Sequence, residues 1–315
     1  MTVDDLAGRV RAGDVRAIAR AISLVENERP SVAALIAALH PHTGRCTVVG
    51  LTGPPGAGKS TLADCLAGEW RARGQRVGII AVDPTSPFTG GALLGDRVRM
   101  QQHAGDAGVF IRSMATRGHL GGLATATGDV ALVLDAAGFD VVLIETVGVG
   151  QDEVEVVRTA DISVVVVVPG TGDDVQALKA GVMEIADVYV VNKADREGAD
   201  RAAASIEALL ALKPADEGGW RPPILRTEAT GGAGITALVE AIDRFLARGP
   251  AEVEARRRLR AGTRVRDLLS RRLVALAEQS LAPGEFETLL DRIARRETDP
   301  HDAAATLAAR FVDRA

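Results

Sequence analysis

The chain has 315 residues and a mass of 32.8 kDa, which is enough for one large α/β domain with appendages or for two modest domains. Hydrophobic residues make up 47% of the chain and charged residues 25%, which excludes a disordered or collagen-like protein. The net charge is -5 and only 3% of the residues are aromatic, so the chain lacks a broad basic surface and the rings that stack on bases. We therefore expect no nucleic-acid partner.

The N-terminal segment is predicted to be helical. Apolar residues recur at helical spacing from Leu6 to Leu39, with breaks at Gly13 and Pro30, which predicts an extension of short helices over residues 1–44. Acidic residues follow Met1 where a signal peptide carries basic ones, and no apolar run approaches the roughly 20 residues that cross a bilayer. We expect a cytoplasmic protein with no membrane partner.

A phosphate-binding motif follows the first predicted strand. An apolar run at 47–51 leads into Gly53-Pro54-Pro55-Gly56-Ala57-Gly58-Lys59-Ser60, and a helix-forming segment begins at Thr61. Small residues let backbone N–H groups converge on phosphate oxygens at the N-terminus of that helix. Lys59 is expected to reach the β- and γ-phosphates, and the Ser60 hydroxyl is the expected magnesium ligand. A glycine-rich turn that binds nothing is the alternative, and the strand–loop–helix context argues against it. Cys65, in the same helix, is expected to be a buried thiol.

The central region alternates strands with helical segments. Near-continuous Val and Ile runs predict strands at 77–82, 109–112, 141–144, 162–168, 188–191 and 224–225, and a last core helix at 235–246. Runs of this kind are typical of a mostly parallel sheet with helices on both faces, so we predict an α/β P-loop NTPase domain over residues 45–249. Ligands of such sheets bind at the carboxyl ends of the strands.

Two acidic residues follow these predicted strands. Asp83 ends the second strand and Glu145 ends the fourth, so both are expected near Ser60 and a magnesium ion. An acid after a strand is more often a turn residue or a helix cap. The neighbouring P-loop favours the metal site.

The tetrapeptide Asn192-Lys193-Ala194-Asp195 follows another strand and predicts guanine recognition. The Asp195 carboxylate can accept hydrogen bonds from guanine N1–H and N2–H₂, a donor pair that adenine lacks. Asn192 is expected to reach N7 and support the loop, and the Lys193 stem to lie over the ring. The loop Glu228-Ala229-Thr230 is placed to offer the Ala229 N–H to guanine O6. These features favour GTP over ATP.

The sequence resembles the MeaB/ArgK family of P-loop GTPases, the family of the human methylmalonic aciduria type A protein. The likeness runs from the N-terminal helices to the C-terminal arm. Four stretches are more specific than generic GTPase motifs: Val82-Asp83-Pro84-Thr85-Ser86-Pro87, Gly91-Ala92-Leu93-Leu94-Gly95-Asp96-Arg97-Val98-Arg99-Met100, Thr116-Arg117-Gly118-His119-Leu120-Gly121-Gly122 and Glu145-Thr146-Val147-Gly148-Val149-Gly150-Gln151.

The resemblance implies a GTPase chaperone of an adenosylcobalamin-dependent acyl-CoA mutase, most often methylmalonyl-CoA mutase. Such proteins use GTP binding and hydrolysis to license delivery of the cofactor and to protect the mutase. The adenosylcobalamin is expected on the partner. We expect slow intrinsic turnover that rises when a partner orders the switch segments.

The resemblance also assigns residues. The phosphate loop would run from Gly53 to Thr61, Gly148 would donate its N–H to the γ-phosphate, and Gln151 is the nearest candidate to orient water, although it could also be an ordinary loop residue. Glu145 stands where many GTPases have an aspartate, which leaves both a direct and a water-mediated magnesium contact open. Two further groups are implied: Asp83, Asp96 and Glu145 around magnesium, and Asp173, Asp174, Gln176 and Lys179 in a switch that contacts the mutase.

Four arginines lie in the same part of the chain and could sense phosphate or partner, although solvated ion pairs are the commoner fate of an arginine. They are Arg97, Arg99, Arg112 and Arg117.

The composition shifts to arginine and alanine after Pro250. Apolar residues follow helical spacing up to a break at Pro283-Gly284 and resume after it. The run Arg256-Arg257-Arg258 is interleaved with acids, which favours a solvated helix face over a nucleic-acid or membrane contact. Helices with so little core of their own need another surface, and the resemblance implies a dimerisation arm over residues 250–315 and a homodimer.

Two other functions fit a P-loop protein. One is a kinase of the ArgK type that acts on amino-acid transport proteins, and the other is a nucleotide-dependent scaffold without turnover. No general base with an acceptor pocket can be identified from the sequence, and the guanine-reading tetrapeptide suits a switch better than a metabolic kinase.

Overall fold

The computed structural model describes residues 1–83, 103, 105–115, 122–146, 159–170, 186–211, 219–282 and 284–312. The chain divides into two compact units, Met1–Arg260 and Ala261–Ala315. The first unit contains the central sheet and the N-terminal helices, and with them the predicted phosphate loop and guanine-recognition residues.

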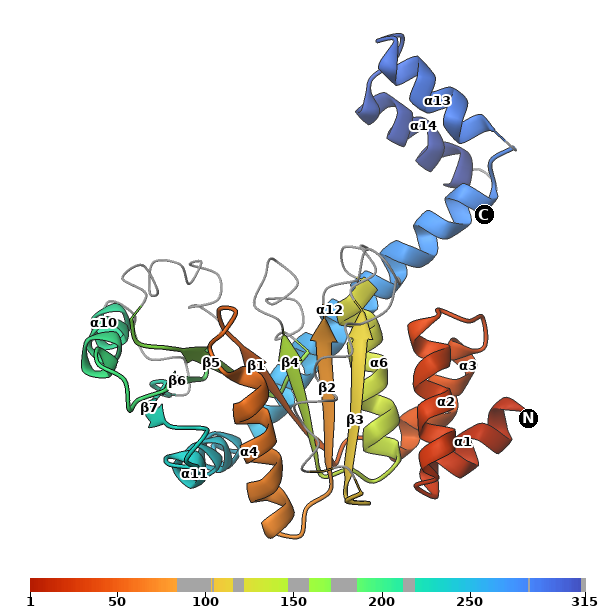
Figure 1. The fold of residues 1–315 in the computed structure, drawn as a ribbon. Coiled ribbons are helices and arrows are strands. Elements are labelled where there is room, and N and C mark those ends of the chain that lie inside the picture. The colour runs from red at the N-terminus through yellow and green to blue at the C-terminus, as the bar shows by residue number, and fades with distance from the viewer. Residues whose placement is uncertain are drawn as a thin grey trace. The chain divides into compact units, whose positions relative to one another are not determined.

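A sheet of seven parallel strands forms the centre of the first unit, in the order β3-β2-β4-β1-β5-β6-β7 (Figure 1). Its inner strands are valine- and isoleucine-rich and buried on both faces, as expected for a parallel sheet covered by helices. All seven predicted strands are confirmed: β1 Thr47–Thr52, β2 Val77–Asp83, β3 Val109–Ala115, β4 Val141–Thr146, β5 Ile162–Val167, β6 Val188–Asn192 and β7 Ile224–Thr227.

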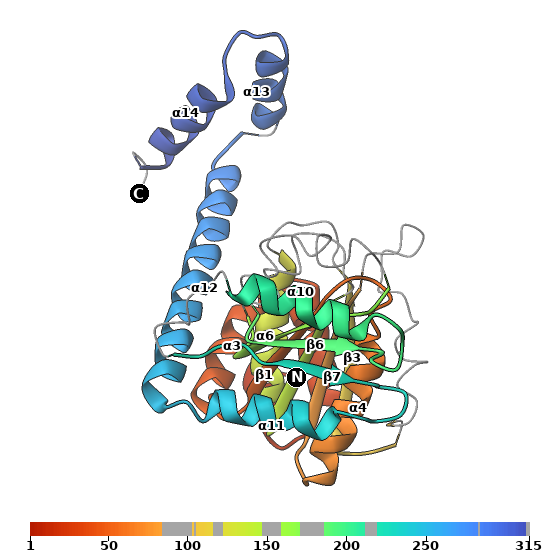
Figure 2. The same ribbon diagram turned by 90° about the vertical axis from the view of Figure 1, so that its left-hand side faces the viewer.

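Helices cover both faces of the sheet, as Figures 1 and 2 show. One face packs against α4 (Lys59–Ala72) and α11 (Ile235–Leu246). The other face packs against α6 (Gly122–Ala136) and, over β5 and β6, against α10 (Ala199–Ala211). The two-sided P-loop architecture predicted from the sequence is therefore confirmed.

The predicted N-terminal helical extension is α1 (Val3–Arg11), α2 (Val15–Glu26) and α3 (Val32–Leu39). The buried apolar residues of these helices join the core that also contains α6 and one face of β2 and β4. The Arg112 guanidinium of β3 bonds the Glu26 carboxylate and the Ser23 hydroxyl of α2. Arg112 is thus one arginine that forms a structural ion pair, which holds α2 against the edge strand.

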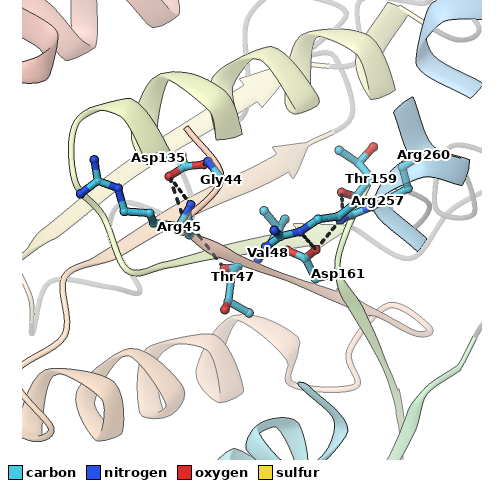
Figure 3. Close-up of polar contacts among 10 residues, drawn as sticks. Gly44, Arg45, Thr47, Val48, Asp135, Thr159, Asp161, Arg257 and Arg260 are labelled. Carbon is cyan, nitrogen blue, oxygen red and sulfur yellow. Dashed lines mark hydrogen bonds and ion pairs between the residues drawn. The ribbon is translucent and has the colours of Figure 1, made fainter. Parts of the chain in front are cut away.

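Carboxylates fix the strands at the amino edge of the sheet, opposite the phosphate loop (Figure 3). Asp135 accepts hydrogen bonds from the N–H groups of Gly44 and Cys46, with N···O distances of 2.5 and 3.1 Å. Asp161 accepts from Val48 N–H at 2.8 Å and pairs with Arg260 of helix α12 (Pro250–Gln279). The bonded N–H groups lie just before β1 and at its start. These bonds therefore anchor the amino end of the strand that leads into the phosphate loop.

Helix α12 (Pro250–Gln279) begins in the first unit. Arg256 pairs with Asp187 at 2.9 Å and lies over the Phe245 ring, 4.6 Å from its centroid. The sequence predicted a solvated helix face for the run Arg256-Arg257-Arg258. The Arg256 side chain is instead half-buried, whereas Arg258 is exposed. The acid that draws Arg256 inward lies 69 residues earlier, where helical charge patterning cannot reveal it.

The second unit consists of the rest of α12 with α13 (Glu285–Ala294) and α14 (Pro300–Val312). Helix α14 lies within the helical arm predicted over residues 250–315, but its bounds were not predicted, because its apolar residues are mostly small alanines. Several large apolar side chains of this unit are exposed, namely Val265, Leu268, Leu269, Leu273, Val274, Phe286 and Leu290. None of the described helices combines the length and the apolar character of a membrane span.

Candidate nucleotide-binding site

The phosphate loop connects β1 to α4 and contains two positions that require glycine. Gly53 has φ +142°, and a Cβ atom there would lie 2.0 Å from the Val166 carbonyl oxygen of β5. Gly58, which caps the N-terminus of α4, has φ +83°, and its Cβ would lie 2.6 Å from Asn192 Nδ2. Both glycines permit a close approach as well as a left-handed backbone.

Lys59 opens α4 and is only 5% exposed. Its ammonium donates to the carbonyl oxygens of Gly53 and Pro54, with distances of 2.6 and 2.9 Å. The lysine therefore spans the loop from its end to its beginning. Among the other loop residues, Ala57 is buried, Pro54 is half-buried, and Pro55, Gly56 and Thr61 are exposed.

Ser60 and Glu145 meet at the carboxyl edge of the sheet. The Ser60 hydroxyl donates to Glu145 Oε1 at 2.5 Å, and both residues are buried. Glu145 lies on β4 in register with Leu51 of β1 and Ala81 of β2, which brings it beside the loop. Within the described residues no group of three or more His, Cys, Asp or Glu side chains could hold a metal ion without other ligands.

Asn192 at the end of β6 connects three parts of the site and is 1% exposed. Its Nδ2 donates to the Ala57 carbonyl of the phosphate loop at 2.9 Å. Its Oδ1 accepts from the Thr227 hydroxyl at 3.0 Å and from the Ala229 N–H at 3.3 Å. One buried amide therefore holds the phosphate loop, the end of β7 and the predicted guanine O6 loop together.

The other residues that were predicted to recognise guanine lie beside Asn192. Lys193 has φ +55° and donates from Nζ to the Gly56 carbonyl at 2.8 Å, so its stem crosses toward the phosphate loop. Asp195 is exposed and follows in the same turn. Glu228 is half-buried and donates its N–H to the Ala233 carbonyl at 3.0 Å, which closes the loop that carries Ala229 and the exposed Thr230.

Three contacts of the site were not predicted from the sequence. Thr227 supports Asn192, the Cys65 thiol of α4 donates to the Ala229 carbonyl at 2.9 Å, and Asp64 pairs with His103 at 3.2 Å. Burial raises the pKa of Asp64, an effect that His103 partly opposes. No short motif links residues this far apart in the sequence, although the position of Cys65, six residues after Lys59 in the same helix, could have drawn attention to it.

For several predicted site residues the structure describes no side chain. Asp83 is described as the last residue of β2, without its side chain. The others lie outside the described residues: Asp96, Gly148, Gln151, Asp173, Asp174, Gln176 and Lys179.

A family model described as methylmalonyl-CoA mutase-associated GTPase MeaB matches residues 18–281. The chain belongs to the MeaB family. A candidate GTPase of Pyrococcus abyssi is 52% identical over 307 residues, 96% of this chain and 94% of that protein. GTPase ArgK of Escherichia coli is 39% identical over 251 residues, 78% of this chain and 76% of that protein. The crystal structure of a protein described as LAO/AO transport system kinase superposes with a TM-score of 0.73 at 27% identity, covering 99% of this chain and 98% of that one.

Membership of the MeaB family makes the chain a P-loop GTPase, which binds GTP and GDP and hydrolyses GTP to GDP and phosphate. The sequence resemblance and the predicted enzyme class are thereby confirmed.

Proposed function

We propose that this MeaB-family GTPase is a cytoplasmic chaperone of an adenosylcobalamin-dependent acyl-CoA mutase, with methylmalonyl-CoA mutase as the first candidate. The family description, which names association with that mutase, supports the proposal. Adenosylcobalamin would be bound by the partner, and the nucleotide state of this chain would control its delivery. We call this control the gate. The observation that carries the gate is the direct bonding of Asn192 to both the phosphate loop and the base loop.

The phosphates and magnesium would bind at the carboxyl edge of the sheet. Lys59 would exchange its two loop carbonyls for phosphate oxygens, and Ser60 with Glu145 offers the hard oxygen donors that magnesium prefers. Magnesium typically binds through few protein oxygens plus the phosphates, so this pair fits the ion, with Asp83 and Asp96 as the proposed surrounding acids. When bound, magnesium neutralises charge on the transferring phosphoryl group.

The guanine base would bind between the loops that Asn192 joins. Asp195 would accept from N1–H and N2–H₂, the Lys193 stem would cover the ring, and the Ala229 N–H would reach O6. The flanking residues Glu228 and Thr230 would complete that loop. Gly148 would donate to the γ-phosphate, and Gln151 would orient the attacking water.

The switch residues Asp173, Asp174, Gln176 and Lys179 would carry the nucleotide state to the mutase. They come shortly after β5, whose Val166 carbonyl faces Gly53 of the phosphate loop. We propose slow intrinsic hydrolysis that rises when the mutase orders this segment. The functional regions would be the helical extension 1–44, the GTPase domain 45–249 and the arm 250–315.

Nucleotide-dependent capture tests this proposal. The immobilised chain, loaded with a non-hydrolysable GTP analogue or with GDP, is exposed to lysate of its source organism, and an acyl-CoA mutase is expected in one nucleotide state only. The Asp195→Asn variant is the matched control, because an amide donor suits the O2 carbonyl of xanthine and should transfer the dependence to xanthosine nucleotides. Equal recovery of the mutase with both nucleotides, or its absence from both, would contradict the gate.

The description of the related structure as a transport system kinase makes phosphoryl transfer the second candidate. Incubation with γ-labelled GTP and the captured protein separates the two functions. We expect the label in free phosphate, whereas label on an acceptor protein would favour the kinase.

The proposed assembly is a homodimer. The exposed apolar side chains of α12 and α13 would be buried against a second copy of the chain. Light scattering should return twice the chain mass at micromolar concentration. A mass near 32.8 kDa would reject the dimer.

A further inference from the structure

The peptide groups on both sides of Ala229 are held by hydrogen bonds. Its N–H donates to Asn192 Oδ1 at 3.3 Å, and its carbonyl accepts from the Cys65 thiol at 2.9 Å. Ala229 is 6% exposed, so water cannot readily replace these partners. The two peptide groups that flank Ala229 are therefore held by side chains from different elements, the N–H by Asn192 of β6 and the carbonyl by Cys65 of α4.

Cys65 brings the second of these bonds from the helix that binds phosphate. It lies on α4 six residues after Lys59 and packs against the core formed by α4, α11 and the sheet, where it is half-buried and not fully buried as predicted. A rigid helix thus carries both the phosphate-binding residues and the donor to the base loop. The Ala229 carbonyl cannot move away from α4 without breaking this bond.

The thiol remains a donor at neutral pH. Burial, together with the neighbouring Asp64 carboxylate, raises the pKa of Cys65 above its ordinary value. The protonated S–H form is therefore the one that faces the Ala229 carbonyl. The same effects make this cysteine a poor nucleophile, which separates its role from redox chemistry.

We propose that Cys65 is a positioning residue for guanine: its bond to the Ala229 carbonyl holds the base loop against α4, at the place from which the Ala229 N–H shares its proton between Asn192 Oδ1 and O6 of the base. Cys65 does not touch the nucleotide and acts through Ala229 alone. The inference rests on the proposed role of Ala229 in base binding. It adds a direct link between the base loop and the phosphate-binding helix, beside the indirect one through Asn192.

Affinities for GDP and ADP, measured by competition with a fluorescent GDP analogue in the presence of magnesium, test the inference on the full chain. Cys65→Ala removes the donor and is expected to weaken GDP binding roughly three- to tenfold, the range of one net hydrogen bond. ADP affinity should stay within about twofold, since adenine has an amino group instead of O6. Cys65→Ser keeps a hydroxyl donor and is expected to restore GDP affinity.

Three results would overturn the inference. The first is an unchanged GDP affinity in Cys65→Ala. The second is a parallel loss of GDP and ADP affinity in that variant, which would indicate a packing defect in α4. The third is a Cys65→Ser variant that binds GDP as weakly as Cys65→Ala. Thermal unfolding of both variants verifies that they are folded. Asp195→Asn separates this inference from the proposed base site: a switch to xanthosine diphosphate supports that site whatever Cys65 does, whereas unchanged GDP binding would remove the site and the inference with it.

Discussion

Replacing Gly53 with alanine is expected to weaken GDP binding by about 100-fold or more, equivalent to about 2.7 kcal/mol. The new Cβ would lie 2.0 Å from the Val166 carbonyl oxygen, which is backbone in a central strand and cannot rotate away as a side chain could. The loop would have to move from β5, and its N–H groups would lose their common direction toward the phosphates. Calorimetric titration with GDP and magnesium measures the loss.

Gly56→Ala is the matched control within the same loop. Gly56 also has a positive φ, +76°, but a Cβ there meets no atom within 4 Å. Its cost should be limited to the left-handed backbone, about 1–2 kcal/mol. If the two variants bound GDP equally well, the close approach to Val166 would not determine the loop conformation.

The parts of the fold that were predicted from the sequence are those with strong local patterns. The strands of the sheet have apolar runs because both faces are buried, and α11 was predicted at its observed bounds because Gly234 precedes a regular apolar spacing. The phosphate loop and the base tetrapeptide are contiguous motifs. Their meeting at Asn192 follows from strand order, in which β5 alone separates β1 from β6.

The features that were missed depend on contacts between distant residues. The Cys65–Ala229 and Asn192–Thr227 bonds join residues separated by 164 and 35 positions, so neither has a local signature. Arg256 was expected in solvent because charge patterning on one helix gives no information on Asp187 of the sheet edge. Helix α14 lies in the predicted helical arm, but its bounds were missed, because its apolar content is mostly alanine and gives only a weak signal.

Asn192→Ala is expected to lower GDP affinity by about 100-fold and to destabilise the fold by about 2–4 kcal/mol, because it leaves several buried groups without their partner. The Ala57 carbonyl, the Thr227 hydroxyl and the Ala229 N–H all bond to this one amide. Its loss would uncouple the base loop from the phosphate loop. Urea unfolding and GDP titration measure the two effects separately.

Thr227→Val provides the graded control, because it removes one of these bonds and keeps the amide and a similar volume. We expect a cost of about 1 kcal/mol in stability and a several-fold loss of GDP affinity. In the double variant the Thr227→Val cost should largely disappear, since the hydroxyl has no partner once Asn192 is gone. Additive costs would mean that Thr227 acts on the site by a route other than Asn192. Unaltered GDP affinity in Asn192→Ala would show that the base and phosphate loops hold their positions without the shared amide.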